Sequence, residues 1–415
     1  MTSTFWRSFG PGLLWAAAAI GVSHLVQSTR AGADAGFALW WVILLALLLK
    51  YPFFEYGPRY AAATGESLVE GYRRVGRWAL WLYILITVST ALIVQLAVVL
   101  FTAFLFRYVF GLPWSPAAVA ALVTVLCASL LFVGRFRGLD RSVKLVVALL
   151  SVSTVFAAVV ALPRADAGTL LPWPLVERHA VALPFLLALM GWMPSAIDIS
   201  VWSSLWTLAK DRDVGSRASV RHALLDFRIG YVGTGLLAVA FVVLGAGVMH
   251  GRGTSFSAQG TQFAIQLVDL YAQTLGGWLR PIVLIAVVTT MFSTALTVID
   301  GFPRAIARSV RVAVRGLDDP GRDDNAVYWA SGAVLGILTV VVIATFVGSL
   351  TAMVDFATTV SFLTAPVLGY LNLRAVTAPN VPRAARPGRA LLALSYTGLV
   401  LLGGTALVYL VSLLT

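Results

Sequence analysis

The chain has 415 residues, of which 59% are hydrophobic and only 12% are charged, and its mean hydropathy is +0.89. Soluble domains carry about 25% charged residues, so this composition excludes a soluble globular protein and indicates a polytopic membrane protein. The formal net charge of +12 does not point to a nucleic-acid partner, because the basic residues sort by predicted side of the membrane.

Apolar runs of about 20 residues predict transmembrane helices. In chain order the sequence contains eleven of them, at 10–33, 37–56, 79–106, 115–134, 143–162, 181–207, 224–249, 279–300, 326–348, 351–372 and 390–414. The first run reaches spanning length without a small-residue cleavage pattern after it, so we expect it to stay in the membrane.

The basic residues predict the orientation of these spans. With the N-terminus inside, 22 Lys and Arg residues fall in cytoplasmic segments, and two, Lys50 and Arg228, lie within or at the edge of spans. The outer loops hold six: Arg30, Arg107, Arg164, Arg178, Arg252 and Arg280. The positive-inside rule therefore predicts a cytoplasmic N-terminus, and eleven spans then place the C-terminus outside. The scarcity of lysine beside arginine is typical of GC-rich bacteria, so we expect the plasma membrane.

Two of the predicted spans contain breaks. The first span breaks at "GVSH", residues 21–24, and the sixth breaks within "LALMGWMPSAIDISVW". In the sixth, Pro194 removes an amide donor and Gly191 weakens the helix before it. Lipid cannot satisfy the freed backbone groups, so such breaks are tolerated only where protein or a water-filled cavity receives them.

The five-span interval between the breaks predicts an inverted repeat. A repeat of five spans must insert its second copy upside down, and the broken first helices of the two copies then meet at the bilayer midplane. The expected organisation is an all-α fold with inverted repeat 1 at 1–163, inverted repeat 2 at 181–375 and an additional span 11 at 389–415. This pattern is typical of secondary transporters.

The partial charges at the breaks predict ion sites. Amide ends, which favour anions, belong to the half-helices that start near Ser23 and Ser195, and carbonyl ends favour small cations. Hydroxyl and imidazole groups at the amide ends can donate hydrogen bonds to an oxyanion. The candidate substrate-binding residues are Gly21, Val22, Ser23, His24, Met193, Ser195 and Ala196.

Several candidates have a structural alternative. Ser195 and Asp198 match the capping box [ST]-x-x-[DE] and would then cap the second half-helix. His24 is also compatible with a packed, hydrogen-bonded position, and Met193 with simple core packing. Arg30, about two turns beyond His24, either draws anions towards the break or anchors the helix at the interface.

Polar residues in later spans suggest ion or proton sites and a surface helix. Asp198, Asp226, Asp300 and Asp355 are candidates for ion or proton binding, although the last two lie near span ends, where pairing with arginine is expected. In "FPRAIARSVRVAVRG", arginines recur every three or four residues on one helical face. This segment is expected to be an amphipathic helix on the inner leaflet, or else a solvated extension of span 8.

Four motifs follow one another in the order found in a known family. "FGPGLLWAAAAIGVSH" has the glycine-proline-glycine opening and the same interval to the break as the Nramp divalent-metal transporters, whose first span continues with Asp-Pro-Gly-Asn. "RAGADAGF", "TGESL" and "MPSAIDIS" then follow in family order, the last where the family has Met-Pro-His. The resemblance covers about residues 9–375 and implies a LeuT-like fold.

The departures from the family pattern bear on substrate. The family's metal-binding aspartate falls on Gly21, its asparagine on His24 and its second-motif histidine on Ser195, while the methionine is kept as Met193. Mn²⁺ and Fe²⁺ shed water on binding, and without that carboxylate little remains to replace their hydration. The chain is most similar to the Nramp-related branch that lacks metal ligands and is associated with bicarbonate transport.

The resemblance also implies a coupling-ion site. LeuT-like transporters hold sodium between span 8 hydroxyls and carbonyls of the first broken helix. The corresponding candidates are Ile20, Gly21, Ser293, Thr294 and Thr297, with Asp198 as a further candidate. Hydroxyls in membrane helices also bond to their own backbone, which is the alternative for the three span 8 residues.

These observations predict a secondary active transporter for bicarbonate, coupled to sodium and working by alternating access. An Nramp-like Mg²⁺ or Mn²⁺ transporter with Asp198 as the charged contact is the first alternative, and a non-transporting sensor or partner subunit is the second. An enzyme is not expected, since the sequence has no nucleotide-binding loop, metal-ligand cluster or nucleophile arrangement. The expected partners are a small inorganic ion and the lipid bilayer, without nucleic acid, an obligatory protein partner or a cofactor other than the coupling ion.

Overall fold

The protein is a bundle of helices. The computed structural model describes residues 9–170, 183–252, 255–317, 325–346 and 348–414, and these ranges contain no strand. The helices are α2 (Pro11–Ala19), η1 (Ser23–Ser28), α3 (Thr29–Ala35), α4 (Trp40–Thr64), α5 (Leu68–Val75), α6 (Arg77–Val109), α7 (Pro116–Ala161), η2 (Leu162–Arg164), η3 (Ala167–Thr169), α9 (Leu183–Gly191), α10 (Ile199–Val214), α11 (Val220–Val248), α12 (Gly260–Leu275), η4 (Gly277–Leu279), α13 (Arg280–Arg315), α14 (Asn325–Phe346), α15 (Leu350–Val376), η5 (Arg383–Ala385) and α16 (Arg389–Ser412).

The apolar helices confirm a multi-pass membrane protein. Within the described ranges, 7 helical segments are long and apolar enough to cross a membrane. They lie in α6, α7, α11, α13, α14, α15 and α16. The first and sixth predicted spans are each divided into shorter helices, α2 with η1 and α3, and α9 with α10, as the breaks predicted. The count of eleven spans stays a prediction.

Two predicted boundaries differ from the structure. Spans 115–134 and 143–162 belong to one helical element, α7, and the basic residues between them are helical rather than a loop. Those residues contain no proline, so nothing in them removes a backbone donor.

The arginine-rich segment after span 8 is likewise the continuous end of α13 and not a separate surface helix, so the alternative of an extension holds there. Arg304 and Arg308 in it pair with the carboxylates of Asp300 and Glu70 instead of facing lipid alone.

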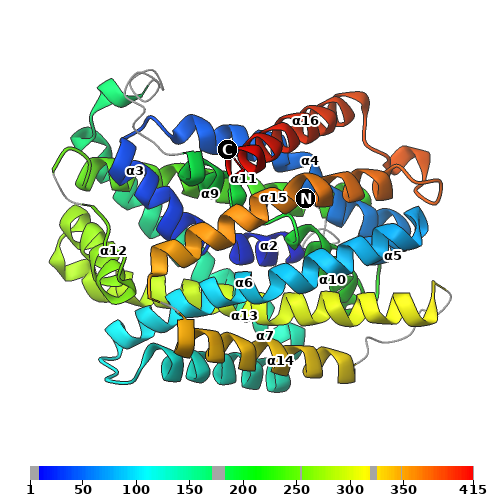
Figure 1. Cartoon of the computed structure of the whole chain (residues 1–415), viewed down its shortest axis with the longest axis horizontal. Helices are drawn as coiled ribbons and strands as arrows, with labels where there is room; N and C mark the ends of the chain where they lie inside the picture. Colours follow the sequence, from blue (N-terminus) through cyan, green and yellow to red (C-terminus); the bar gives the residue numbers. More distant parts are fainter. Residues whose placement is uncertain (1–8, 171–182, 253–254, 318–324, 347, 415) are drawn as a thin grey trace.

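The first broken helix lies in the interior of the bundle. Figure 1 shows α2 near the middle of the molecule, with α13 and α14 side by side along one edge and α16 along the opposite edge. Helix α11 packs against α2, η1 and α3 in turn. Its Gly245 meets α3 so closely that an added Cβ would lie 2.2 Å from the carbonyl oxygen of Thr29. Small residues of this kind let membrane helices approach at backbone distance.

The second broken helix is enclosed by other elements. Helix α9 packs against α15 and α4, while α10 packs against α4, α2 and α13. The two breaks line one cavity together with apolar residues of α6 and α13, while α11 and α15 pack against the broken helices from outside it.

Candidate functional site

The first break is extended at one residue and then becomes a π-helix. Helix α2 ends at Ala19, Ile20 adopts an extended conformation with φ −79° and ψ 93°, and the chain resumes as the π-helix η1 at Ser23. A π-helix shifts the hydrogen bonds from i+4 to i+5 and occurs mostly as single turns near functional sites. Thr29 donates its hydroxyl to the carbonyl oxygens of Leu25 at 3.0 Å and His24 at 3.2 Å. Side-chain hydroxyls thus satisfy carbonyl groups at this irregular turn.

The second break is longer than the sequence predicted. Helix α9 ends at Gly191 and α10 begins only at Ile199, so its amide end lies beyond the predicted start at Ser195. The predicted capping box is wrong, because Asp198 at the N-cap makes no side-chain capping hydrogen bond. Both carboxylate oxygens of Asp198 are instead buried without a hydrogen-bond partner among the described residues.

A small cavity lies between the two breaks. It has a volume of about 30 Å³, and a cavity needs about 10–15 Å³ by this measure to hold one water molecule. Four of the predicted substrate-binding residues line it, namely Val22, Ser23, Ser195 and Ala196. Two of the cation candidates, Asp198 and Thr294, line it as well. The site is therefore assembled and nearly closed in this conformation.

The other three predicted substrate-binding residues lie outside this lining. Gly21 and Met193 are buried nearby, and His24 is fully buried and turned towards α11. The Nε2 atom of His24 lies 3.0 Å from the carbonyl oxygen of Thr234, and its Nδ1 atom lies 2.7 Å from the Ser23 hydroxyl. Since a carbonyl can only accept, Nε2 carries a proton. In this conformation His24 reaches the cavity only through Ser23.

Oxygen atoms gather at the carbonyl end of α2. The hydroxyl of Thr294 on α13 lies 2.9 Å from the carbonyl oxygen of Ile20 and 3.2 Å from that of Ala17. It also lies 3.1 Å from the carbonyl oxygen of Thr290, one turn earlier in α13. One hydroxyl proton cannot satisfy three acceptors at once. Oxygen atoms are the ligands that hard cations prefer, so this arrangement suits a small cation.

Some of the remaining cation candidates lie beside the oxygen atoms around Thr294, and the others make different contacts. A Cβ on Gly21 would lie 2.7 Å from Thr294 Cγ2, so glycine is what allows the close approach. The Ser293 hydroxyl is buried without a hydrogen-bond partner among the described residues. Thr297 donates to the carbonyl oxygen of Thr294 at 2.8 Å, as its structural alternative predicted. Asp198 lies on the cavity side, beside Thr90 of α6, whose hydroxyl donates to Ile86.

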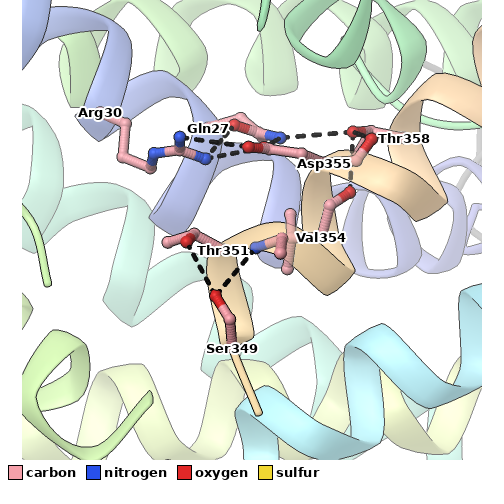
Figure 2. A network of polar contacts seen from close by, with 8 residues as sticks. Gln27, Arg30, Ser349, Thr351, Val354, Asp355 and Thr358 are labelled. Carbon is pink, nitrogen blue, oxygen red and sulfur yellow. Dashed lines mark hydrogen bonds and ion pairs between the residues drawn. The ribbon is translucent and has the colours of Figure 1, made fainter. Parts of the chain in front are cut away.

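Arg30 and Asp355 close one end of the first broken helix. Their ion pair is 2.7 Å long and joins α3 to α15. Figure 2 shows Gln27 beside this pair, donating to Asp355 at 2.9 Å and to the Thr358 hydroxyl at 3.3 Å. The expected pairing of Asp355 with an arginine is confirmed, and so is that of Asp300, which pairs with Arg304 at 2.6 Å. Arg30 serves neither as a free anion attractor nor as a simple lipid anchor in this conformation.

The opposite end of the first broken helix is held by Asp226 of α11. Its carboxylate accepts the backbone N–H of Gly12 at 2.7 Å and that of Gly10 at 3.3 Å. These are the free amides at the positive end of α2, where an anionic side chain is favoured. Asp226 therefore anchors a half-helix and is not directed into the cavity.

One charged residue at the second break is not among the predicted site residues. Lys50 of α4 is fully buried, and its Nζ atom lies 2.7 Å from the carbonyl oxygen of Ser195, 2.8 Å from that of Gly191 and 3.1 Å from that of Met190. The available signal was a lone lysine within the apolar run "WWVILLALLLKYPFF". An ionisable residue inside a span is a candidate for function by default.

The chain is similar to a family of membrane proteins that includes named metal transporters. The family model described as natural resistance-associated macrophage protein-like (Nramp) matches residues 12–412. Uncharacterized protein PM0681 of Pasteurella multocida is 36% identical over 378 residues, which cover 89% of this chain and 84% of that protein. The divalent metal cation transporter MntH of Chromohalobacter salexigens is 26% identical over 250 residues, which cover 59% of this chain and 58% of that protein.

Solved structures share the fold. The crystal structure of the Eremococcus coleocola manganese transporter matches with a TM-score of 0.74 at 15% identity, covering 98% of this chain and 87% of that chain. MhsT in complex with L-phenylalanine matches with a TM-score of 0.66 at 14% identity, covering 97% and 98%. These likenesses confirm the predicted LeuT-like fold. With the family model matching nearly the whole length, the chain belongs to the Nramp family and is a secondary transporter, not an enzyme.

Proposed function

We propose that this Nramp-family transporter moves bicarbonate, coupled to sodium, by alternating access across the plasma membrane with its N-terminus in the cytoplasm. The observation that carries the proposal is the kind of side chain that lines the central cavity. Hydroxyls of Ser23 and Ser195 and the small side chain of Ala196 line it, and the first break contributes no carboxylate. In the described part of the chain, no group of three or more His, Cys, Asp or Glu residues could hold a metal ion.

The chemistry of the cavity lining favours an oxyanion over a transition metal. The Ser195 hydroxyl can donate a hydrogen bond to a bicarbonate oxygen, and Ser23 could do so on releasing the carbonyl oxygen of Ala19, to which it donates at 2.8 Å. The amide end of α10 adds a partial positive charge on the same side. Transition metals prefer imidazole, thiolate or carboxylate ligands. Asp198 is the one carboxylate of the lining, and a buried carboxylate without a partner is costly unless a cation or a proton neutralises it.

The carbonyl end of α2 supports sodium as the coupling ion. Oxygens of Ala17, Ile20 and Thr294 already lie together there, and the unpartnered Ser293 hydroxyl is one residue before Thr294. Sodium at this point would tie α2 to α13, the two elements that must separate for the cavity to open. Its charge would also lower the electrostatic cost of the nearby Asp198 carboxylate when an anion enters.

Alternating access is supported by the contacts at both ends of the first broken helix. The Arg30–Asp355 pair closes the end predicted to face outside, and Asp226 holds the end predicted to face the cytoplasm. Neither contact is made by a residue that lines the central cavity of about 30 Å³. Release of one of these contacts while the other is kept would expose the cavity to one side at a time.

A divalent-cation transporter remains the second candidate, because Asp198 places an unpartnered carboxylate in the cavity. A partly hydrated Mg²⁺ binds proteins through one or two carboxylates and keeps several waters. Relatives named as divalent metal cation transporters add weight to it. A non-transporting sensor is not favoured by any contact in the structure.

Luminal pH in proteoliposomes tests the proposal. Bicarbonate entry followed by CO₂ escape makes the lumen alkaline, whereas CO₂ leakage alone makes it acidic. We expect alkalinisation that an inward sodium gradient accelerates and that the double variant Ser23→Ala, Ser195→Ala slows by about tenfold or more, equivalent to losing one or two hydrogen bonds to a charged ligand. The matched control is Ser331→Ala on α14, whose hydroxyl bonds to its own helix.

The proposal fails if protein-containing and empty vesicles show the same pH change. In that event Mg²⁺ and Mn²⁺ uptake is measured in the wild type and in Asp198→Asn. Uptake that the Asn variant abolishes while its melting temperature is kept would establish the second candidate.

A further inference from the structure

Lys50 occupies an unusual position for a charged side chain. It is fully buried in the middle of α4, between apolar residues that precede it and the aromatic ring of Phe54, whose centroid lies 5.7 Å from Nζ. Among the described residues no carboxylate forms an ion pair with it. Its positive charge is therefore compensated only by backbone dipoles.

The three contacts of Lys50 specify its charged form. Carbonyl oxygens of Met190, Gly191 and Ser195 lie 3.1, 2.8 and 2.7 Å from Nζ. An ammonium group has three N–H donors, whereas a neutral amine has two and would direct a lone pair at the third oxygen. The geometry thus fits an ammonium ion with every proton donated.

The Lys50 ammonium group lies at the carbonyl end of α9, where the electrostatic potential favours a cation. Met190 and Gly191 are the last residues of α9, where the helix dipole is negative, and Ser195 lies within the break, directly after Pro194. In transporters with broken helices, such carbonyl ends receive small cations. Here the position is taken by a side chain that is covalently attached to α4.

The same ammonium lies next to the central cavity. Ser195 accepts its shortest hydrogen bond and also lines the cavity, so a single residue separates the charge from the cavity wall. A fixed positive charge in surroundings of low polarity repels cations and attracts anions over several ångströms.

We propose that Lys50 is the resident cation of the second break and a determinant of substrate charge. It fills the carbonyl end of α9, which would otherwise take a cation from solution, and its charge favours an anion in the adjoining cavity. The preference for an anion rests on the proposed function, whereas the filling of the carbonyl end does not.

The test replaces Lys50 with methionine, which keeps an apolar chain of nearly the same length and removes the ammonium group. In purified protein, ammonium chloride is expected to raise the melting temperature of Lys50→Met by about 2 °C relative to choline chloride at equal ionic strength, because ammonium ions enter the vacated carbonyl site. The wild type is expected to show no such difference. Lys210→Met, at the end of α10, is the matched control for loss of a lysine charge.

The second measurement is the KM for bicarbonate in proteoliposomes. Lys50→Met is expected to raise it by at least about tenfold, while Lys210→Met leaves it unchanged, since only the first variant removes charge beside the cavity. A folded Lys50→Met without the ammonium response overturns the resident-cation role, whatever its KM. An ammonium response with unchanged KM overturns the role in substrate charge.

Two further outcomes are also decisive. If the wild type carries no bicarbonate, the proposed function and the role in substrate charge fail together, and the ammonium response alone decides whether Lys50 is a resident cation. If Lys50→Met does not fold in choline, it is prepared in ammonium chloride. Recovery of folded protein by ammonium supports the resident-cation role, and failure of ammonium to recover it overturns that role.

Discussion

At the first break, between α2 and η1, the freed carbonyls meet hydroxyl groups, whereas at the second break, between α9 and α10, they meet a lysine ammonium. Thr294 and Thr29 are neutral and can exchange their acceptors, which suits the uptake and release of the proposed coupling ion at the first break. Lys50 is charged and cannot leave its helix. The two breaks, which the predicted repeat relates to each other, thus both supply hydrogen-bond partners for their freed carbonyl groups. The partners at the first break suit a mobile cation, whereas the partner at the second break is a fixed charge.

Of the changes that test this difference between the two breaks, removal of the Thr294 hydroxyl should have the largest effect. Thr294→Val keeps the shape of the side chain but takes one oxygen from the group around Ile20, so the sodium concentration for half-maximal transport should rise by about tenfold or more, or 1.4 kcal/mol in binding free energy. Sodium-dependent uptake in proteoliposomes measures it. Thr289→Val is the control, because that hydroxyl is on the same helix and bonds to Ala286. Equal sodium dependence in both variants would remove the cation site from the first break.

The π-turn of the first break should be the next most sensitive feature. Thr29→Val removes the hydroxyl that serves the carbonyl oxygens of His24 and Leu25 without changing the size of the side chain. We expect a loss of about 1 kcal/mol in stability, typical of buried hydrogen bonds in membrane proteins. Unfolding in denaturing detergent measures it against Thr405→Val on α16, whose hydroxyl is exposed. A loss no larger than that of the control would show that the π-turn does not need the hydroxyl.

The Arg30–Asp355 ion pair, at the end predicted to face outside, should give the smallest effect. Arg30 and Asp355 are 15% and 34% exposed, and pairs open to solvent contribute about 0.2–1 kcal/mol. Asp355→Asn should therefore shift the balance towards an outward-open form by about two- to fivefold. Maleimide labelling of Val22→Cys from the outside measures this shift, since Val22 lines the cavity. The control is Glu66→Gln, which breaks the exposed Arg74–Glu66 pair. If Asp355→Asn leaves the labelling rate unchanged, or if Glu66→Gln changes it equally, the Arg30–Asp355 pair is not a gate.

The positions of both breaks were predictable because their causes are local. Glycine at 21 and the Gly191 and Pro194 pair interrupt apolar runs, and their effects on the backbone do not depend on distant residues. The pairing of Asp300 with Arg304 is equally local, since the two lie four residues apart on one helix.

The contacts that define the site were not predictable in the same way. His24 is held by Thr234, and Lys50 by residues 140 positions or more away in the chain, so their orientations depend on how helices pack. The capping box failed for a related reason. Its motif describes a helix that starts at Ser195, but in the fold the carbonyl of that residue accepts a hydrogen bond from Lys50 and α10 starts four residues later.

The small size of the central cavity has a consequence for the energetics of transport. At about 30 Å³ it holds about two or three water molecules, so opening it to a hydrated ion must draw further waters in from one side. The cycle therefore exchanges water with the medium at each opening, and its rate depends on water activity. Osmolytes such as sucrose, which are excluded from protein surfaces, would favour the closed form, so sucrose added at fixed ion concentrations would slow transport.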